Sequence, residues 1–417
     1  MVGKDVSEDR QRGGARCAGR EPGDPASARR LGVGRRSRRP DERDIVFARM
    51  AYTPGGPAFE DYYSRHPELR AVDDALRALP GLCAEGSRSF HPLNARIAPA
   101  VFALLASWRP LVAGGAGGGE RGGERGGAHG GPPADGADAL GFSRIEVSDD
   151  ETRRALTARV KGLARYFGAL DVGVTLLTPD FVYSHAGRHE EDYGREISLD
   201  HTHAIVFTVE MDFRFMKAAP GLPVVTESSR RYLEAAKVAL ALAANLRALG
   251  WSARAHIDGS YLAVLPPLAA RAGLGEIGRL GILVTEHRGP CVRLGLVTTD
   301  LPLVPDEPRP FGLQDFCRIC LKCARNCPSQ AISREPTAPG EGWRISWERC
   351  YGFWRRQGTD CGMCLISCPY SKPDTPFHRF VRECIRRSDA ARRVAVWGDD
   401  LLYGRRPFER WEPDWWT

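Results

Sequence analysis

Eight cysteines in the last quarter of the 417-residue chain carry the spacing of a repeated metal-binding motif. The first four are Cys317, Cys320, Cys323 and Cys327, at intervals of three, three and four, and Pro328 follows directly. In the pattern C-x2-C-x2-C-x3-C-P, three thiolates bind one 4Fe–4S cluster and the fourth reaches a second cluster. These cysteines therefore predict a second set of ligands.

The second set lies in "CGMCLISCPYSKP". Cys361, Cys364 and Cys368 repeat the last three members of the pattern, and Pro369 follows. One ligand is missing from this repeat, and Cys350, eleven positions before Cys361, is the nearest upstream candidate. The two motifs together predict two 4Fe–4S clusters.

Two-cluster ferredoxins exchange one cysteine between their motifs, and we assign the ligands on that crossed arrangement. One cluster takes Cys317, Cys320, Cys323 and Cys368, and the other takes Cys327, Cys350, Cys361 and Cys364. Zinc and disulfide bonds are the alternatives. Zinc sites rarely use three-cysteine runs that end in Cys-Pro, and a disulfide framework belongs to small secreted domains.

The charge of the chain is concentrated near its beginning. The formal net charge is +7, and residues 1–49 hold 13 Lys and Arg against 8 Asp and Glu, so the remaining chain carries only +2. This argues against a nucleic-acid partner. No window is apolar enough to span a bilayer, and no apolar stretch follows the twin arginines as an export signal requires. Scattered thiols and reduced clusters fit a cytoplasmic location.

Composition and periodicity divide the chain into six parts. We expect a disordered basic tail over 1–49, a helical region over 50–112, a glycine-rich linker over 113–138, an α/β domain over 139–305, a ferredoxin-like cluster domain over 306–372, and a C-terminal segment over 373–417 that packs on the core.

The α/β class rests on alternating helical and strand patterns between 139 and 305. Helices are expected over 149–170 and 228–250, the second capped by Ser228 or Ser229 and ended by Gly250. Strands are expected over 171–178, 203–212, 253–258, 281–287 and 292–299.

A glycine-rich stretch, "AGLGEIGRLG", lies between the α/β part and the cysteines. Gly273, Gly275 and Gly278 permit tight turns and a close approach of the backbone to a bulky ligand. It is not the dinucleotide-binding fingerprint, because no glycine-rich turn here follows a strand and precedes a long helix with an acidic residue at the required distance.

This stretch, followed by the eight cysteines, resembles the reductive dehalogenases, which are cobalamin-dependent enzymes with two 4Fe–4S clusters. The resemblance extends over roughly residues 140–405, through "FVYSHAGR", "HAIVFTVEMD", "AHIDGSY" and "DDLLYGRRP". It implies a nitroreductase-like cobalamin-binding core and an electron path through both clusters to the corrinoid. It also implies an organohalide substrate and an external electron donor such as a ferredoxin or flavodoxin.

The resemblance further implies roles for individual residues. Tyr232 would be the proton donor, and Arg293 the cation that favours its phenolate form by lowering the phenol's pKa. The expected cofactor-binding residues are His203, Ser260, Gly273, Gly275, Glu276, Gly278 and Arg279. Members of the family often carry asparagine or lysine where this chain has Ser260.

Simpler roles remain open for several of these residues. Tyr232 could pack on the apolar face of its helix, and Arg293 could form a surface ion pair. Glu276 and Arg279 are three positions apart and could pair with each other. His201 and His203 could be structural histidines.

Two other functions remain open for the whole chain. One is that of epoxyqueuosine reductase, a related cobalamin and iron–sulfur enzyme of transfer-RNA maturation. That enzyme usually carries an aromatic residue and a lysine where this chain has Glu276 and Arg279. The other is an electron-transfer protein that binds no cobalamin.

Overall fold

The computed structural model describes residues 39–113, 143–336, 342–406 and 411–416. The predicted glycine-rich linker lies outside these residues except for residue 113, and so does the predicted tail up to residue 38.

A four-stranded sheet forms the centre of the fold, with strand order β1-β2-β6-β3. Its strands are β1 (Val172–Leu176), β2 (His203–Glu210), β3 (Ala253–His256) and β6 (Val292–Thr299). The predicted strands 171–178, 203–212, 253–258 and 292–299 are confirmed to within two residues at their ends. All three pairings are antiparallel. The predicted class of mixed helices and sheet is confirmed, but the sheet is not the parallel one that alternating helices and strands suggest.

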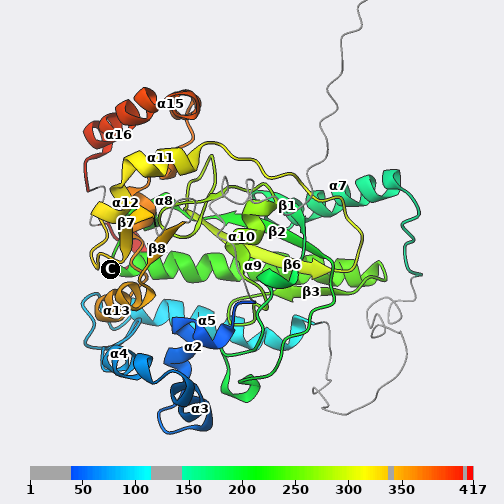
Figure 1. Cartoon of the computed structure of the whole chain (residues 1–417), viewed down its shortest axis with the longest axis horizontal. Helices are drawn as coiled ribbons and strands as arrows, with labels where there is room; N and C mark the ends of the chain where they lie inside the picture. The colour runs from blue at the N-terminus through cyan, green and yellow to red at the C-terminus, as the bar shows by residue number, and fades with distance from the viewer. Residues whose placement is uncertain (1–38, 114–142, 337–341, 407–410, 417) are drawn as a thin grey trace, which may run out of the picture.

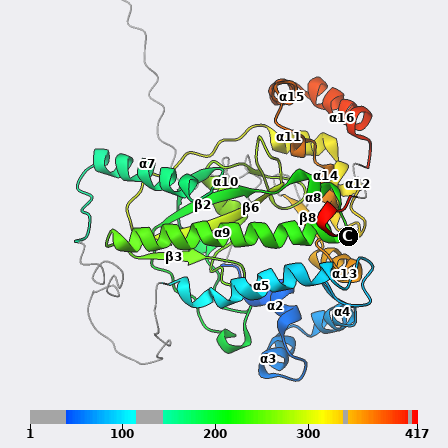
Figure 2. The same ribbon diagram turned by 180° about the vertical axis from the view of Figure 1, so that it is seen from behind.

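Helices cover both faces of this sheet (Figures 1 and 2). Successive side chains of a strand point to opposite faces. From β2, Ile205 and Phe207 join the core beneath the long helix α9 (Leu222–Ala248), whereas Ala204 and Val206 join the core beneath α10 (Leu265–Arg271). Two further helices, α5 (Ile97–Ser107) and α7 (Asp150–Tyr166), pack on α9.

Helix α9 begins six residues earlier than the sequence pattern predicts. Its N-cap is Gly221, and a proline stands in its first turn, where a fixed φ favours helix and no amide donor is lost. Ser228 and Ser229 are buried within the helix, so the prediction that either is the cap is wrong. The predicted end is confirmed, because Gly250 follows the helix with φ +83°.

The predicted strand 281–287 is only a short β5 (Leu283–Val284), paired with β4 (Glu276–Ile277) in a two-stranded ladder apart from the main sheet.

The N-terminal part consists of short helices: α2 (Val46–Ala51), α3 (Pro57–Arg65) and α4 (Pro67–Arg77). The prediction of disorder is wrong for residues 39–49, since Ala48 and Arg49 are buried. Arg49 forms ion pairs with Asp73 at 3.4 Å and with Glu348 at 2.8 Å, and Glu348 belongs to the cysteine region. These contacts hold the N-terminal helices against the C-terminal third of the chain.

The cysteine region consists of short elements around the eight thiols. In chain order they are α11 (Leu313–Cys320), α12 (Lys322–Arg325), β7 (Ile332–Pro336), β8 (Trp343–Ile345), α13 (Trp347–Gln357) and α14 (Met363–Ser367).

Beyond the cysteine region, α15 (Pro376–Arg387) and α16 (Asp389–Tyr403) form a hairpin of helices against α11 (Figure 1). Further on, Trp416 is buried against Ala95, Leu222 and Val225. None of the helices in the described ranges has both the length and the apolar composition needed to cross a membrane.

Candidate functional site

The structure brings the eight cysteines together in two groups of four. Burial and the nearby thiols of Cys317, Cys320 and Cys368 raise the pKa of Cys323, with a smaller effect from Cys364 of the other group. Burial and the thiols of Cys361, Cys350 and Cys327 likewise raise the pKa of Cys364. Each group therefore contains three cysteines of one motif and one from the other motif, which is the crossed arrangement predicted from their spacing.

The first group surrounds a cavity. Cys317, Cys320, Cys323 and Cys368 line one common cavity, together with Arg279 and the apolar side chains Leu280, Leu313, Phe316, Leu321 and Pro369. All eight cysteines are free thiols. Among the described residues, no three His, Cys, Asp or Glu side chains converge to hold a single metal ion. The four thiols thus face a shared space without being arranged around a single ion.

A buried hydroxyl lies near these thiols. The Tyr370 side chain packs edge-on against Phe311 and Phe316, and its buried hydroxyl has no hydrogen-bond partner in the part of the chain that the structure describes. Cys317 and Cys368 lie within electrostatic reach of this tyrosine. Since buried polar groups are nearly always hydrogen-bonded, this donor fits an acceptor at the cysteine group that the protein itself does not supply.

The second group lies close to the start of α9. Gly362, between Cys361 and Cys364, has φ +65°, which favours glycine, and a Cβ there would lie 3.0 Å from Val224 of α9.

Tyr232 and Arg293 are brought together as predicted, from α9 and β6. The guanidinium carbon of Arg293 lies 5.1 Å from the centroid of the Tyr232 ring. Its Nη2 donates to Ser228 Oγ at 2.5 Å and forms an ion pair with Asp360 at 3.3 Å. Because Asp360 directly precedes Cys361, this ion pair connects the tyrosine to the second cysteine group.

Arg293 lowers the pKa of Tyr232 as expected, but the net shift of that pKa is upward. Burial raises the pKa of the phenol, and the charge of Arg293 opposes this only in part. Desolvation disfavours the phenolate more strongly than one cation favours it. Tyr232 is therefore protonated at neutral pH, which is the state that a proton donor requires.

Three further ionisable side chains are within electrostatic reach of Tyr232 and Arg293: Arg188, Asp258 and Tyr261. With Tyr232, Arg293 and Asp360 they form what we call the polar site. Five of these side chains keep some accessible surface, yet burial is the first cause of the pKa shift of each. They are Tyr232, Asp258, Tyr261, Arg293 and Asp360. These side chains are thus partly accessible and largely surrounded by the protein.

Sequence reasoning missed some members of the polar site. Asp258 and Tyr261 stand next to Ser260 in "DGSY" but were not predicted as site residues. Asp360 could have been suggested by its position before Cys361. Arg188 carries no local signal beyond its place in "FVYSHAGR".

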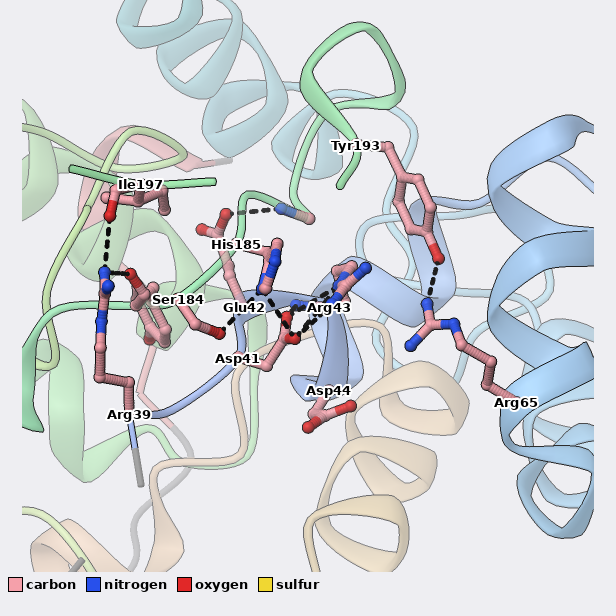
Figure 3. Close-up of polar contacts among 12 residues, drawn as sticks. Arg39, Asp41, Glu42, Arg43, Asp44, Arg65, Ser184, His185, Tyr193 and Ile197 are labelled. Carbon is pink, nitrogen blue, oxygen red and sulfur yellow. Dashed lines mark hydrogen bonds and ion pairs between the residues drawn. The ribbon is translucent and has the colours of Figure 1, made fainter. Parts of the chain in front are cut away.

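An N-terminal strap, residues 39–44, fixes the loop that carries Arg188 (Figure 3). Arg39 Nη2 donates to the carbonyls of Tyr183 at 2.5 Å and Ile197 at 2.6 Å. The buried Glu42 carboxylate accepts hydrogen bonds from the Gly187 amide at 2.9 Å and the Arg188 amide at 3.3 Å. The strap therefore determines where the Arg188 backbone lies.

The same loop is tied to the turn that carries Asp258. His189 Nε2 donates to the carbonyl of Gly259 at 2.7 Å. Ser260 is buried in this turn, so of the predicted cofactor-binding residues it is the one that belongs to the polar site.

The three predicted ligand-approach glycines face the chain itself. A Cβ on Gly273 would lie 2.7 Å from the Glu307 carbonyl oxygen, and one on Gly275 would lie 2.3 Å from that of Val284. One on Gly278 would lie 2.8 Å from a methyl carbon of Val284. These close approaches pack β4 against β5 and against the chain before α11, which corrects the expectation of a ligand there.

Glu276 and Arg279 take different partners, so the alternative of a local pair between them is wrong. Glu276 is buried and accepts hydrogen bonds from the amides of Phe311 at 2.7 Å and Leu313 at 3.1 Å, where α11 begins. Its carboxylate therefore holds the start of the helix that carries the first cysteines.

Arg279 is also buried and lies at the first cysteine group. It donates to the carbonyls of Cys317 at 2.6 Å and Ser333 at 3.0 Å, and its guanidinium stacks on Trp343 at 4.7 Å. Both residues thus position cysteines and lie outside the polar site.

His203 lies far from the polar site. In the β2–β6 pairing, Val209 is opposite Arg293 and His203 is opposite Thr299, so six residues, or about 20 Å of strand, separate them. His203 bonds the hydroxyl of Thr202 at 2.8 Å, and His201 bonds Thr298 at 2.8 Å. Both histidines have structural partners.

No protein-family model matches the chain. Among curated proteins it is 35% identical over 233 residues to a tetrachloroethene reductive dehalogenase of Desulfitobacterium hafniense, covering 52% of this chain and 42% of that protein. It is 31% identical over 289 residues to the tetrachloroethene reductive dehalogenase of Sulfurospirillum multivorans, covering 60% and 57%. The chain thus spans about half the length of these relatives.

A more distant relative is the epoxyqueuosine reductase of Lactococcus garvieae, 31% identical over 120 residues, which cover 25% of this chain and 31% of that protein.

Two solved structures are similar over most of the chain. One is the catabolic reductive dehalogenase NpRdhA in complex with 3-bromo-4-hydroxybenzoic acid, with TM-score 0.66, 27% identity, and coverage of 90% of this chain and 48% of that one. The other is a reductive dehalogenase whose structure suggests a mechanism for B12-dependent dehalogenation, with TM-score 0.63, 29% identity, and coverage of 82% and 47%.

Proposed function

We propose, since this chain is a homologue of the reductive dehalogenases, that it is a corrinoid-dependent reductase that removes halide from an organohalide. The observation that carries the proposal is the contact of Tyr232 with Arg293, next to an aspartate that adjoins a cluster cysteine. In the overall reaction the organohalide takes up two electrons and one proton. The carbon–halogen bond breaks, a carbon–hydrogen bond forms, and halide leaves.

Two 4Fe–4S clusters are proposed on the two groups of cysteines. The fit is supported by the cavity of the first group and by the unpartnered Tyr370 hydroxyl beside it, which would meet a cluster sulfide. Arg279 fixes the backbone of Cys317, and Glu276 fixes the start of its helix. The clusters supply one-electron transfer when bound.

Cobalamin is proposed beside the polar site. The fit is supported by the buried Arg293 Nε, which has no hydrogen-bond partner among the described residues, and by the half-buried polar side chains around it. Ser260, Asp258 and Tyr261 are the residues proposed to contact it. When bound, cobalamin supplies a cobalt centre at which a carbon–halogen bond can be reduced.

The protein's own residues would hold and move the proton. Tyr232 carries it on its hydroxyl, because burial keeps the pKa of this group above its usual value. Arg293 would stabilise the phenolate that remains after proton transfer. Ser228 and Asp360 hold the guanidinium in place, so that its charge stays beside the ring.

An electron carrier outside the chain is proposed to supply the electrons, a ferredoxin or flavodoxin being the expected type. We also propose a reducing cytoplasm as the compartment, because that environment keeps thiols and clusters reduced.

The experiment is anaerobic reconstitution with iron, sulfide and cobalamin, followed by metal analysis and an absorption spectrum. About eight iron atoms and one cobalt per chain are expected, with halide released from a halogenated phenol in the presence of a reductant. A chain that binds iron but no cobalamin would be an electron-transfer protein. Turnover of an epoxide-bearing nucleoside without halide release would indicate an epoxyqueuosine reductase.

A further inference from the structure

The hairpin of α15 and α16 exposes large apolar side chains that no other described residue covers. Phe380, Trp397 and Leu401 keep 68%, 67% and 68% of their surface accessible. We call five of the exposed apolar residues of the two helices the hairpin face: Phe377, Phe380, Val394, Trp397 and Leu401; Leu402 and Tyr403 are exposed as well. An exposed apolar patch of this kind on a folded domain usually marks a binding surface.

The spacing of these residues gives the face its shape. Val394, Trp397 and Leu401 recur at intervals of three and four, so they share one side of α16, while Arg392 and Asp399 are buried on another. His378 Nε2 and the Tyr403 hydroxyl lie 2.7 Å apart and align the start of α15 with the end of α16.

Buried ion pairs fix the hairpin to the cysteine region. The Lys322 ammonium, buried on α12, pairs with Asp399, and with Asp400 at 2.8 Å. Arg392 reaches Asp315 of α11 at 3.5 Å, and Asn326 donates to the Arg405 carbonyl at 2.8 Å. The hairpin face is therefore held in a defined orientation beyond α11, the helix that ends in Cys317 and Cys320 (Figure 1).

The charge around the hairpin face indicates what kind of partner could bind there. Residues 373–406 contain eight arginines and five acidic residues, a net charge of +3. Arg379, Arg387 and Arg393 are exposed on the same two helices, where Arg379 pairs with Asp374 at 2.9 Å and Arg387 pairs with Glu383 at 2.5 Å. A second copy of this chain would bring these arginines against each other, whereas an acidic protein would be attracted to them.

We propose that the hairpin face is the docking surface for a small acidic electron-carrier protein. The proposal rests on the proposed function, which requires an external donor. In each encounter the reduced carrier loses one electron and a cluster of this chain gains it, so two encounters supply the two electrons of one turnover. A few apolar side chains within a charged rim suit the small, short-lived interfaces of redox partners.

The test measures cluster reduction in the reconstituted full chain by a reduced acidic ferredoxin, with stopped-flow absorption at low ionic strength. Trp397→Ala and Arg393→Glu should each slow the second-order rate roughly tenfold or more. Arg393→Lys should retain the rate, because the charge is kept. The wild-type rate should fall as salt is added, and that of Arg393→Glu should fall less steeply.

Matched controls come from α7, where Tyr166 and Arg154 are exposed on another helix of the molecule. Tyr166→Ala and Arg154→Glu should leave the ferredoxin rate unchanged. Dithionite should reduce every variant at the wild-type rate, and the iron content should be the same in all of them.

Three outcomes would overturn the docking proposal. In the first, the hairpin variants accept electrons from ferredoxin as fast as the wild type does. In the second, the variants lose binding to anionic lipid vesicles while the ferredoxin rate is unchanged, which would make the face a membrane-binding surface. In the third, they lose only self-association. Failure of the proposed function would look different, because the reconstituted wild-type chain would still be reduced by ferredoxin but would release no halide from the halogenated phenol.

Discussion

The guanidinium carbon of Arg293 lies 5.1 Å from the centroid of the Tyr232 ring, although 60 positions separate the two residues in the sequence. The contact combines a phenol whose pKa is raised by burial with a cation that opposes that shift. Three of the four predictions that follow concern this pair and the cysteines next to it.

Tyr232→Phe should reduce turnover by at least about 10²-fold, because a general acid typically contributes that much to a reaction rate. Iron and cobalt contents should be unchanged, since the ring and its packing remain. Halide release and metal analysis of the same preparation provide the measurement. Tyr166→Phe, on the exposed surface of α7, is the matched control. Full activity of Tyr232→Phe would show that another group donates the proton.

Arg293→Gln should shift the pH dependence of turnover. The cation lowers the pKa of Tyr232, so its removal raises that pKa further. A step that needs the protonated phenol declines as pH rises through the pKa, and in the variant this decline should therefore occur at higher pH. The maximal rate should also fall, because the phenolate loses its partner. If the pH profile of the variant did not shift, Arg293 would not act on the group that donates the proton.

Cys350→Ala tests the one cysteine outside the repeated motif. It should lose about half of the iron, because one of two 4Fe–4S clusters would lack a ligand. Cys384→Ala, which changes a thiol of α15 outside both groups, should keep all of it. Iron analysis after anaerobic reconstitution provides the comparison. An unchanged iron content in Cys350→Ala would assign the fourth ligand of that cluster to another residue.

Gly275→Ala should destabilise the protein by about 1–3 kcal/mol, since the new Cβ would lie 2.3 Å from the Val284 carbonyl oxygen and the backbone would have to shift. Thermal unfolding provides the measurement. Gly162→Ala is the control, because nothing lies within 4 Å of its added Cβ, and alanine in a helix is favoured over glycine. Equal stability of Gly275→Ala and the wild type would contradict the close packing of β4 against β5.

The sequence predicted the grouping of the cysteines better than it predicted the contacts of the residues around them. The cysteine grouping follows from spacing, because three ligands within a short motif must lie close together whatever the rest of the chain does. Glu276, Arg279 and the glycines beside them were predicted to bind the cofactor, and the contacts that they make within the chain were not predicted. Glu276 bonds amides more than 30 positions away, a contact that no local pattern encodes.

The strand and helix positions were largely predictable from periodicity, which depends only on neighbouring residues. The early start of α9 was not, because Leu222 and Val225 of its first turns pack on Ala95 and Trp416, which lie far away in the sequence. Similarly, His203 was grouped with the site by sequence blocks, but the β2–β6 register places it at the far end of the strand.

The sequence by itself determined the two sets of four cysteines, the positions of the four strands of the main sheet, and the pairing of Tyr232 with Arg293 through resemblance. Only the tertiary structure decided the balance of charge around the tyrosine, by bringing Arg188, Asp258, Tyr261 and Asp360 toward it from separate segments. The physical reason is that ligand spacing and periodicity are local properties of the chain, whereas desolvation and electrostatic reach depend on which distant segments fold against one another.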